Sequence, residues 1–466
     1  NKKSIAARVG DEVELKYVLD LRDFEGDPIQ EKIVHDYKVI AEDPEVAIVV
    51  ETMGGVEPAY TFVKTMLEAG KHVTTSNKAL VAAKGAELIA LAKEKNVKLN
   101  NDYVTDDFRE KFDPAAFAEG VTDIGDEWYT VTEQMPIIQC LFFYNKSILE
   151  QAGVNEIPKT YSEFREACKK VTEMGNGNIY GLIDGGKQMN RMDVMARSLA
   201  AAAGGKVAAT QKVLTDNGVA PYDSKEMNEA LGLIKGLVDD GSIHPDTINV
   251  SAPEARELFA QGQAAFLCQG MWCVSQWDAN YPDLKYGVMA VPVPDGVTNT
   301  YVQAGELSPW MGIYKQSKHP KEAAEYLMAL YDEQYGYQQS NVESGSFVSC
   351  IPEINEKYMT NEHMKEYYTI AEETSRVVPT LVKRDEKAND FYAEVKDVQP
   401  SLGAIVQGII SQSLTDYSSA LKTLADDTTT EWKRASEAVG MDYSSLEFPN
   451  WDVTKDYTDA DYAALK

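Results

Sequence analysis

The feature that most limits the fold of this chain is a change in sequence pattern near residue 100. Residues 1–100 alternate short β-branched runs with stretches of helical periodicity, whereas residues 101–466 hold longer helical stretches rich in Tyr, Asp and Gln. Strands that alternate with helices indicate a parallel sheet with right-handed crossovers. The pattern therefore predicts an α/β protein with a domain boundary near Asn100 and Asn101, which separates residues 1–100 from residues 101–466.

The negative charge is concentrated in the second segment. Residues 1–100 contain 14 basic and 17 acidic side chains, residues 101–466 contain 31 and 57, and the formal net charge of the 466 residues is −29. Such acidity repels phosphate backbones, and no basic patch offsets it, so we expect no nucleic-acid partner. No run approaches the 18 apolar residues that mark a membrane-spanning helix, so we expect no spanning segment.

Two further features bear on the compartment of the protein. The chain starts at Asn1 without an apolar signal region, so we expect any export or lipid-anchor segment to be absent from this chain. The five cysteines stand at irregular spacing, mostly beside apolar residues, which predicts buried free thiols. A disulfide between Cys268 and Cys273 is the alternative, and a zinc site is not supported because that pair lacks two further ligands.

The first segment has a regular order of predicted elements. Strands are expected at residues 13–19, 47–51, 71–75 and 97–99, and helices at residues 58–70 and 79–95. The first of these helices starts at Pro58, places Tyr60, Val63 and Leu67 on one face, and ends at Gly70.

Residues 43–46, 49–60 and 67–82 then carry a specific likeness. Over about residues 4–99 the sequence resembles homoserine dehydrogenase. In that family a Gly-Gly pair approaches the nicotinamide nucleotide, and a Thr-x-Asn-Lys turn contributes to the active site. The matching positions here are Gly54, Gly55, Thr75, Asn77 and Lys78.

Two parts that a dehydrogenase needs are not found with this likeness. A dinucleotide site uses a G-x-G-x-x-G turn after the opening strand, and the chain starts after that point. The likeness also ends at residue 100, before the part that carries the family's catalytic lysine and aspartate. We therefore expect a truncated, inactive Rossmann-like fragment that binds no cofactor, with an NAD(P)-dependent homoserine dehydrogenase as the alternative function.

The second segment carries motifs of another family. They lie, in order, at residues 125–131, 141–149, 157–164, 254–266, 270–272, 286–294, 318–327 and 398–432. Over about residues 101–450 the sequence resembles the extracellular carbohydrate-binding proteins of ABC importers. The local sequence also predicts the helix that this family opens here, because Thr160 and Glu163 form a capping-box pattern before an apolar stripe of Phe164, Ala167, Cys168 and Val171.

This resemblance implies a periplasmic-binding-protein-like architecture of two α/β lobes. The lobes would join through a hinge near residues 139–145 and 305–313 and close over a sugar without catalysis. It further implies a monomer at the cell surface or outside the cell, as in lipoproteins of this type, with an ABC importer permease as partner and neither metal nor cofactor. No hydrolase or metalloenzyme motif competes with this interpretation.

A sugar site needs aromatic platforms for C–H faces and polar side chains for hydroxyls. Trp272 in the G-x-W turn is the first candidate, followed by Trp310 and Trp128. The polar candidates lie where the family tends to place ligand-binding residues; they are Gln139, Gln188, Asn190 and Glu306.

One departure from the family concerns the start of the first lobe. The family begins this lobe with about a hundred residues that supply sugar contacts, and here the dehydrogenase-like fragment takes their place. Either the fragment completes the sheet of the first lobe, or the joint is a fusion. A chimera with neither activity is therefore a third possibility. Two local features receive structural interpretations: residues 175–178 as a helix end and turn, and residues 452–461 as a solvated acidic tail.

Overall fold

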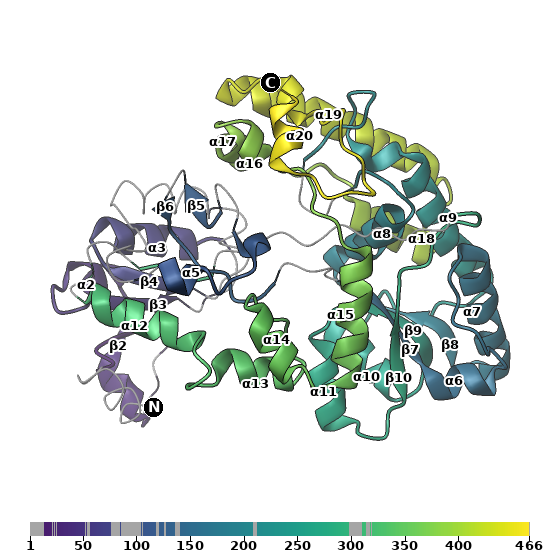
Figure 1. The fold of residues 1–466 in the computed structure, drawn as a ribbon, viewed down its shortest axis with the longest axis horizontal. Helices are drawn as coiled ribbons and strands as arrows, with labels where there is room; N and C mark the ends of the chain where they lie inside the picture. Colours follow the sequence, from purple (N-terminus) through teal and green to yellow (C-terminus); the bar gives the residue numbers. More distant parts are fainter. Residues whose placement is uncertain are drawn as a thin grey trace. The chain divides into compact units, whose positions relative to one another are not determined.

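The computed structural model describes residues 14–20, 22, 24, 26–51, 53, 56–75, 84, 104, 106–117, 121–124, 127–135, 140–207, 212–297, 310–313, 317 and 319–465 (Figure 1). The chain divides into two compact units. Unit 1 comprises Asn1–Lys111, Val121–Val131 and Pro309–Tyr331, and unit 2 comprises Phe112–Gly120, Thr132–Ser308 and Asp332–Lys466. The predicted boundary at Asn100 and Asn101 lies outside the described residues.

Unit 1 contains a β/α/β crossover. Strands β3 (Ile48–Glu51) and β4 (His72–Thr75) pair in parallel, and α3 (Ala59–Glu68) connects them. The helix buries Ala59, Val63 and Met66, and Gly70 ends it with φ of +72°. The predictions of strands at 47–51 and 71–75 and of the helix between them are confirmed.

Among the described residues, unit 1 also contains one longer helix, α12 (Pro320–Leu330), and several short elements. The short elements are β1 (Val18–Leu19), η1 (Pro28–Lys32), β2 (Ile33–Val34), α2 (Tyr37–Glu42), α5 (Asp106–Arg109), β5 (Asp123–Ile124) and β6 (Glu127–Trp128). Of residues 14–19, the described part of the strand predicted at 13–19, Val18–Leu19 pairs, in parallel with β2. The helix predicted at 79–95 and the strand predicted at 97–99 lie outside the described residues, except for Lys84.

Unit 2 is organised around a four-stranded sheet. Its strands are β7 (Leu141–Asn145), β8 (Tyr180–Ile183), β9 (Ala264–Gln269) and β10 (Tyr286–Met289), in the order β10-β7-β9-β8. Strand β8 runs parallel to β9, whereas β7 runs antiparallel to both β9 and β10. The carboxyl ends of β8, β9 and β10 therefore share one edge, at which β7 begins.

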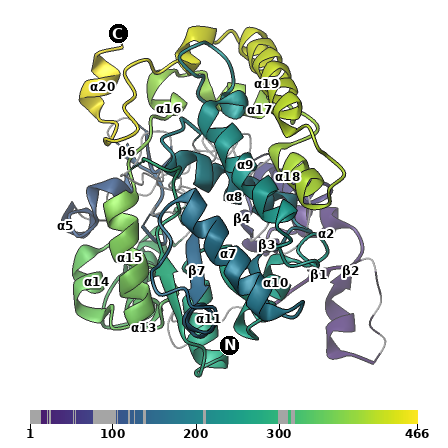
Figure 2. The same ribbon diagram turned by 90° about the vertical axis from the view of Figure 1, so that its right-hand side faces the viewer.

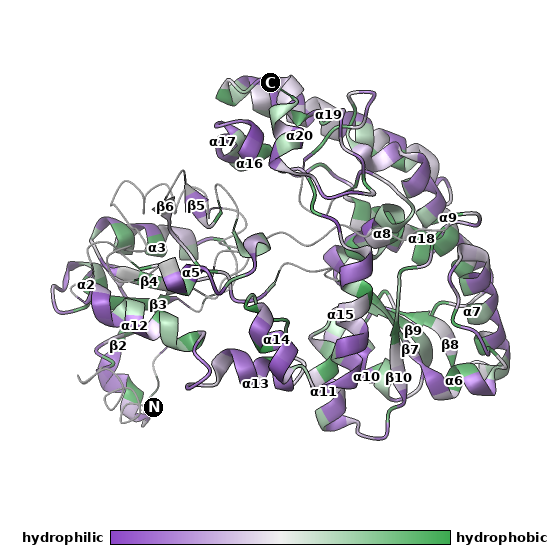
Figure 3. Ribbon diagram, viewed as in Figure 1, coloured by the Kyte–Doolittle hydropathy of each residue, from purple (hydrophilic) through white to green (hydrophobic). Residues whose placement is uncertain are grey.

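Helices α6 (Lys146–Gln151), α7 (Tyr161–Gly175), α10 (Ala252–Ala260) and α15 (Glu362–Thr374) pack against this sheet (Figure 2). The other helices of this part of unit 2 are α8 (Met189–Ala202), α9 (Lys225–Asp239), α11 (Cys273–Asn280), α13 (Tyr337–Glu343), α14 (Pro352–Tyr358) and α18 (Leu402–Ile410), of which α18 packs on α8 and α9. Strands β7 and β9 are buried at every position, which explains the hydrophobic colouring along the sheet in Figure 3.

Helix α7 forms as its sequence predicts. The Thr160 side chain accepts from the backbone N–H of Glu163, whose carboxylate accepts in return from the backbone N–H of Thr160. The predicted apolar stripe from Phe164 to Val171 is buried, since it faces the sheet. The helix ends at Asn176, which takes a left-handed conformation with φ of 46°. The prediction of a helix end and turn at residues 175–178 is confirmed.

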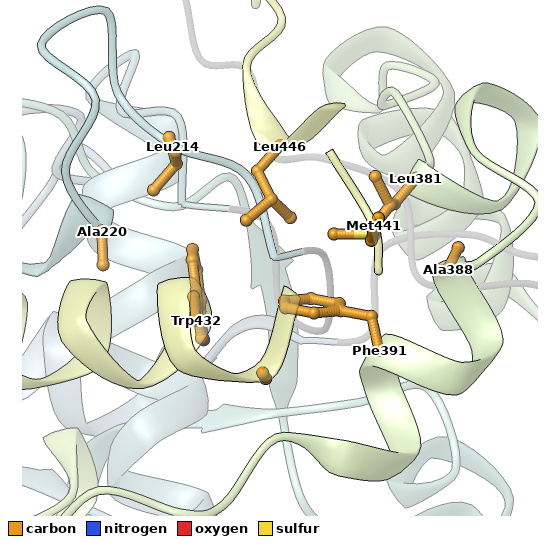
Figure 4. Close-up of a cluster of buried hydrophobic side chains, with 9 residues drawn as sticks. Leu214, Ala220, Leu381, Ala388, Phe391, Trp432, Met441 and Leu446 are labelled. Carbon is orange, nitrogen blue, oxygen red and sulfur yellow. The ribbon is translucent and has the colours of Figure 1, made fainter. Parts of the chain in front are cut away.

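The last third of unit 2 packs a second core. Elements η3 (Pro221–Asp223), α16 (Leu381–Arg384), α17 (Ala388–Glu394), α19 (Tyr417–Val439) and η4 (Tyr443–Leu446) contribute to it. Figure 4 shows the side chains of this cluster, which are Leu214, Ala220, Leu381, Ala388, Phe391, Trp432, Ala435, Met441 and Leu446.

The interpretation of residues 452–461 as a solvated acidic tail is correct for the exposed Asp452, Asp456 and Asp459 and wrong for the segment as a whole, which is packed through Tyr457. Trp451 and Tyr457 are buried against Phe448 and Val213, ahead of α20 (Asp459–Ala463). Three of its carboxylates accept backbone hydrogen bonds: Asp452 from Thr454, Asp456 from Val377, and Asp461 from Thr458. Sequence reasoning missed this packing because a segment whose aspartates cap turns has the same composition as a solvated tail.

The hinge prediction is partly wrong. Residues 141–145 form β7, a buried strand that is hydrogen-bonded on both sides, so they do not bend. The chain instead passes between the units at five places, after Lys111, Gly120, Val131, Ser308 and Tyr331. The fourth of these passages falls within the predicted segment 305–313. Beside it, the backbone N–H of Val131 donates to the Met311 carbonyl at 2.8 Å.

All five cysteines are buried free thiols, as predicted, and the alternative disulfide between Cys268 and Cys273 is not formed. Among the described residues, no group of three or more His, Cys, Asp or Glu side chains could hold a metal ion. The same residues include no helix long and apolar enough to cross a membrane.

The second core gives a stability prediction. Phe391 is fully buried, so Phe391→Ala should lower the free energy of unfolding by about 3–5 kcal/mol, because it removes apolar contacts and leaves a cavity. Asp390→Ala, on the exposed side of α17, should change it by less than about 0.5 kcal/mol. Urea denaturation followed by circular dichroism measures both, and equal shifts would contradict the assignment of this cluster as a core.

Candidate functional site

The candidate site lies at the edge of the unit 2 sheet where β8 and β9 end. After β8, residues 184–188 lead into α8, and after β9, residues 270–272 lead into α11. In α/β sheets, ligands bind at the carboxyl ends of the strands because loops and helix N-termini converge there. We call residues 184–190 and 270–272 the carboxyl-edge site.

Trp272 presents its side chain to solvent at this edge. It is 42% exposed, although its neighbours Met271 and Cys273 are buried. It occupies the N-cap position of α11, where its backbone is held by the buried residues on both sides. An exposed indole on a fixed backbone is the kind of rigid apolar surface on which a sugar C–H face stacks.

The loop after β8 is held by close backbone packing. A Cβ atom at Gly185 would lie 2.3 Å from the backbone nitrogen of Ala252, and one at Gly186 would lie 2.6 Å from the carbonyl oxygen of Thr247. Only glycine fits at these two positions. The Gly186 carbonyl also accepts from the Gln407 side chain of α18. This close packing therefore holds the loop in one position against α10 and α18.

The two polar candidates after β8, one in the loop and one in the first turn of α8, differ in their contacts. The Oε1 atom of Gln188 accepts from the backbone N–H of Ala252 at 2.7 Å, so part of this side chain stabilises the start of α10. Asn190 is exposed in the first turn of α8. Asn190 is thus the better placed of the two to meet a ligand hydroxyl.

Met189, between them, was missed by sequence reasoning. It is 50% exposed, and its flexible thioether side chain adds apolar surface to the site. The sequence gives no signal for this role, because a methionine at the start of a helix with Met192 and Met195 on its buried face fits an ordinary packing position.

Beneath the two loops lies a buried ion pair. The Oδ1 atom of Asp184 accepts from the backbone N–H of Gly185 at 2.7 Å and from the Gln269 side chain at 3.3 Å, and its Oδ2 atom lies 3.5 Å from Nη2 of Arg191. Asp184 is 1% exposed and Arg191 7%. Burial raises the pKa of the Asp184 carboxyl, and the Arg191 guanidinium opposes this rise.

The tryptophan candidates of unit 1 are less exposed than Trp272. Trp128 is 5% exposed, with Phe108 stacked at 6.1 Å and the guanidinium of Arg109 at 5.1 Å from its ring. Trp310 is half-buried and meets Tyr331 edge-on at 6.3 Å. We therefore rank both below Trp272 as sugar platforms.

Several predicted positions lie outside the described residues: Gln139, Glu306, Gly54, Gly55, Asn77 and Lys78. Thr75 is the last residue of β4, at the carboxyl end of a parallel strand. Of the predicted set, Gln188 and Asn190 follow β8 and Trp272 follows the neighbouring strand β9, so all three come after strand ends at the same edge of the sheet.

The fold and this site define an α/β protein of the periplasmic-binding-protein type. The sequence profile of the family described as bacterial extracellular solute-binding protein matches residues 29–337. The chain belongs to this family, which is not catalytic. A protein of Brucella abortus (strain 2308), provisionally named a binding protein, is 25% identical over 236 residues, which cover 50% of this chain and 53% of that protein. The chain thus spans about half the length of the curated relatives it matches first.

Solved structures share the fold at low identity. The GacH receptor of Streptomyces glaucescens, solved unliganded and with acarbose, is 18% identical with a TM-score of 0.57, over 84% of this chain and 99% of the receptor. A sugar transporter protein of Bacillus licheniformis, solved with stachyose, is 16% identical with a TM-score of 0.54, over 83% of this chain and 100% of that protein. The α/β architecture predicted from the sequence is confirmed at this level.

A second, shorter likeness is also found. Homoserine dehydrogenase of Lactococcus lactis (strain IL1403) is 50% identical over 60 residues, which cover 13% of this chain and 14% of that enzyme. The solute-binding family match begins at residue 29, so it includes most of the range 4–99 for which the sequence resembles homoserine dehydrogenase.

The packing of the β8 loop gives a second prediction. Gly185→Ala should destabilise the protein by about 1–3 kcal/mol, because the added methyl group meets the backbone of α10. Gly232→Ala in α9 is the matched control: its Cβ would meet the end of the Tyr417 side chain at 3.2 Å, and alanine favours a helix, so stability should stay equal or rise. Thermal melting compares them, and a tolerated Gly185→Ala would contradict the close packing.

Proposed function

We propose that the protein binds a carbohydrate outside the cell and presents it to the permease of an ABC importer. The observation that carries this proposal is the exposed Trp272 ring at the carboxyl edge of β9. Membership of a non-catalytic solute-binding family supports it, as do structural relatives that were solved with acarbose and with stachyose.

The chemistry of the carboxyl-edge site suits a sugar. Sugars present apolar C–H faces together with many hydroxyl groups, so they bind to aromatic surface flanked by amide side chains. Trp272 would stack on one sugar face, Met189 would cover adjacent apolar surface, and Asn190 would exchange hydrogen bonds with hydroxyls. We infer further contacts from Gln188, Trp310, Trp128, Gln139 and Glu306.

The N-terminal segment has its own proposal. We infer that residues 1–100 are a homoserine dehydrogenase-like fragment joined to a solute-binding segment of residues 101–466, and that the chain acts as a monomer at the cell surface, as lipoproteins of this type do. The short likeness to homoserine dehydrogenase supports the first part. The fragment would serve as scaffold and bind no nicotinamide cofactor.

The dehydrogenase alternative has a direct test. Incubation of the protein with homoserine and NAD or NADP should give no reduced nicotinamide, because the sequence contains no G-x-G-x-x-G turn after an opening strand. Absorbance of the reduced cofactor is the measurement. Turnover that disappears in Lys78→Ala would revive the enzyme interpretation.

Trp272 gives the main test of sugar binding. In a panel of mono- and oligosaccharides that includes stachyose, one sugar at about 100 times its dissociation constant should stabilise the protein by about 2.7 kcal/mol. Trp272→Ala should abolish this shift, because the platform is lost, and leave the ligand-free melting midpoint almost unchanged, because the ring is exposed. Trp272→Phe should retain part of the affinity.

Tyr335→Ala is the control for loss of an exposed aromatic ring, since Tyr335 is also in unit 2 but lies far in sequence from the two site loops. It should bind the sugar as the wild type does. Equal affinities for the wild type and Trp272→Ala would remove Trp272 from the site, and flat curves across the whole panel would count against a carbohydrate ligand.

A further inference from the structure

Arg191 connects the carboxyl-edge site to three strands of the sheet. It lies in the first turn of α8, and its guanidinium is turned inward. Its Nη2 atom donates to the carbonyl oxygen of Cys268 in β9 and lies 3.5 Å from Asp184, which follows β8. Its Nη1 atom donates to Sγ of Cys140, directly before β7, at 3.4 Å. One planar cation therefore touches the ends of β7, β8 and β9.

The partner of this cation also connects the two site loops. Asp184 opens the loop of residues 184–188 and holds the backbone of Gly185. The same carboxylate accepts from the side chain of Gln269, the residue that precedes the loop of residues 270–272. These contacts form one network of Asp184, Gln269 and Arg191. The network holds the first loop at its first residue, Asp184, and the second loop at Gln269, the residue before it.

The network is poorly explained as a device for stability alone. Within the described part of the chain, Oδ2 of Asp184, Nε of Arg191 and Oε1 of Gln269 have no hydrogen-bond partner, although all three atoms are buried. Buried ion pairs with incomplete hydrogen bonding contribute little net stability, because desolvation offsets their attraction. Apolar residues of similar size would hold the core at least as well. What they could not supply is the directional bonding between three strand ends.

We propose that Arg191 and Asp184 are positioning residues that fix the loop of residues 184–188, which leads to Asn190, relative to the loop of residues 270–272. The inference rests on the proposed function for the role of the two loops, but the geometry that it explains does not depend on a ligand. A sugar that contacts both loops loses affinity when their relative position is free to vary, because ordering them then opposes binding.

Removal of one or both partners separates positioning from stability. Arg191→Met should lower the melting midpoint, since it leaves the Asp184 carboxylate buried and unpaired. The double variant Arg191→Met with Asp184→Asn should recover most of that loss. A structural role predicts that sugar affinity recovers with the midpoint. The positioning role predicts that affinity stays about tenfold or more below the wild type in the double variant.

A second readout needs no ligand. Hydrogen exchange should be about tenfold faster at the amides of residues 185–188 and 270–272 in the double variant, and unchanged in the middle of α7. Arg191→Lys provides a second route if the double variant folds poorly: it keeps a charge beside Asp184, yet a compact ammonium cannot reach Cys268 and Cys140 at the same time, so loop exchange should again rise.

The control is a second Arg–Asp pair in unit 2. The Nη2 atom of Arg165 on α7 donates at 2.9 Å to Asp240 at the end of α9, so this pair joins two helices rather than the site loops. Arg165→Met with Asp240→Asn should leave loop exchange and sugar affinity unchanged. Wild-type exchange at both loops in the Arg191 variants would overturn the positioning role. If wild-type protein binds no sugar of the panel, the proposed function fails, and the exchange experiment still decides the role of Arg191.

Discussion

The parallel pairing of β8 with β9 is the constraint on which the rest of unit 2 depends. Because the two strands run in the same direction, both end at one edge of the sheet, and the chain must leave that edge twice through short loops into α8 and α11. The antiparallel β7, placed between β9 and β10, brings a third strand end to the same edge. Apolar burial holds the sheet together, whereas polar groups gather only where the strands stop.

The fold could be predicted where short-range signals and burial agree. Helix α7 has a capping box, an apolar stripe and a left-handed end residue, and each could be found within a few residues of sequence. The β3–α3–β4 crossover was predictable for the same reason, since β-branched runs flank an amphipathic helix. The packed C-terminal segment was not, because burial of Trp451 and Tyr457 depends on Val213, more than two hundred residues earlier.

The site was predictable only in part. A tryptophan after a glycine at a strand end is a visible signal, and Trp272 is indeed exposed at such a place. The roles of Asp184 and Arg191 arise from contacts with Cys268 and Cys140, which neighbour them only through the order of the strands. Hydrogen-bond geometry of this kind has no local sequence pattern, since an arginine in the first turn of a helix is ordinarily solvated.

The burial of all five thiols makes the protein suitable for site-specific chemistry. Cys140, Cys168, Cys268, Cys273 and Cys350 are all covered in the folded state, so a thiol reagent would have no exposed native cysteine to modify. A single cysteine introduced on the surface, as in Lys187→Cys, would then carry a fluorescent label on the exposed part of the loop after β8. This position leaves the candidate side chains Gln188, Asn190 and Trp272 in place, so the fluorescence of the label would report on a ligand at the carboxyl-edge site.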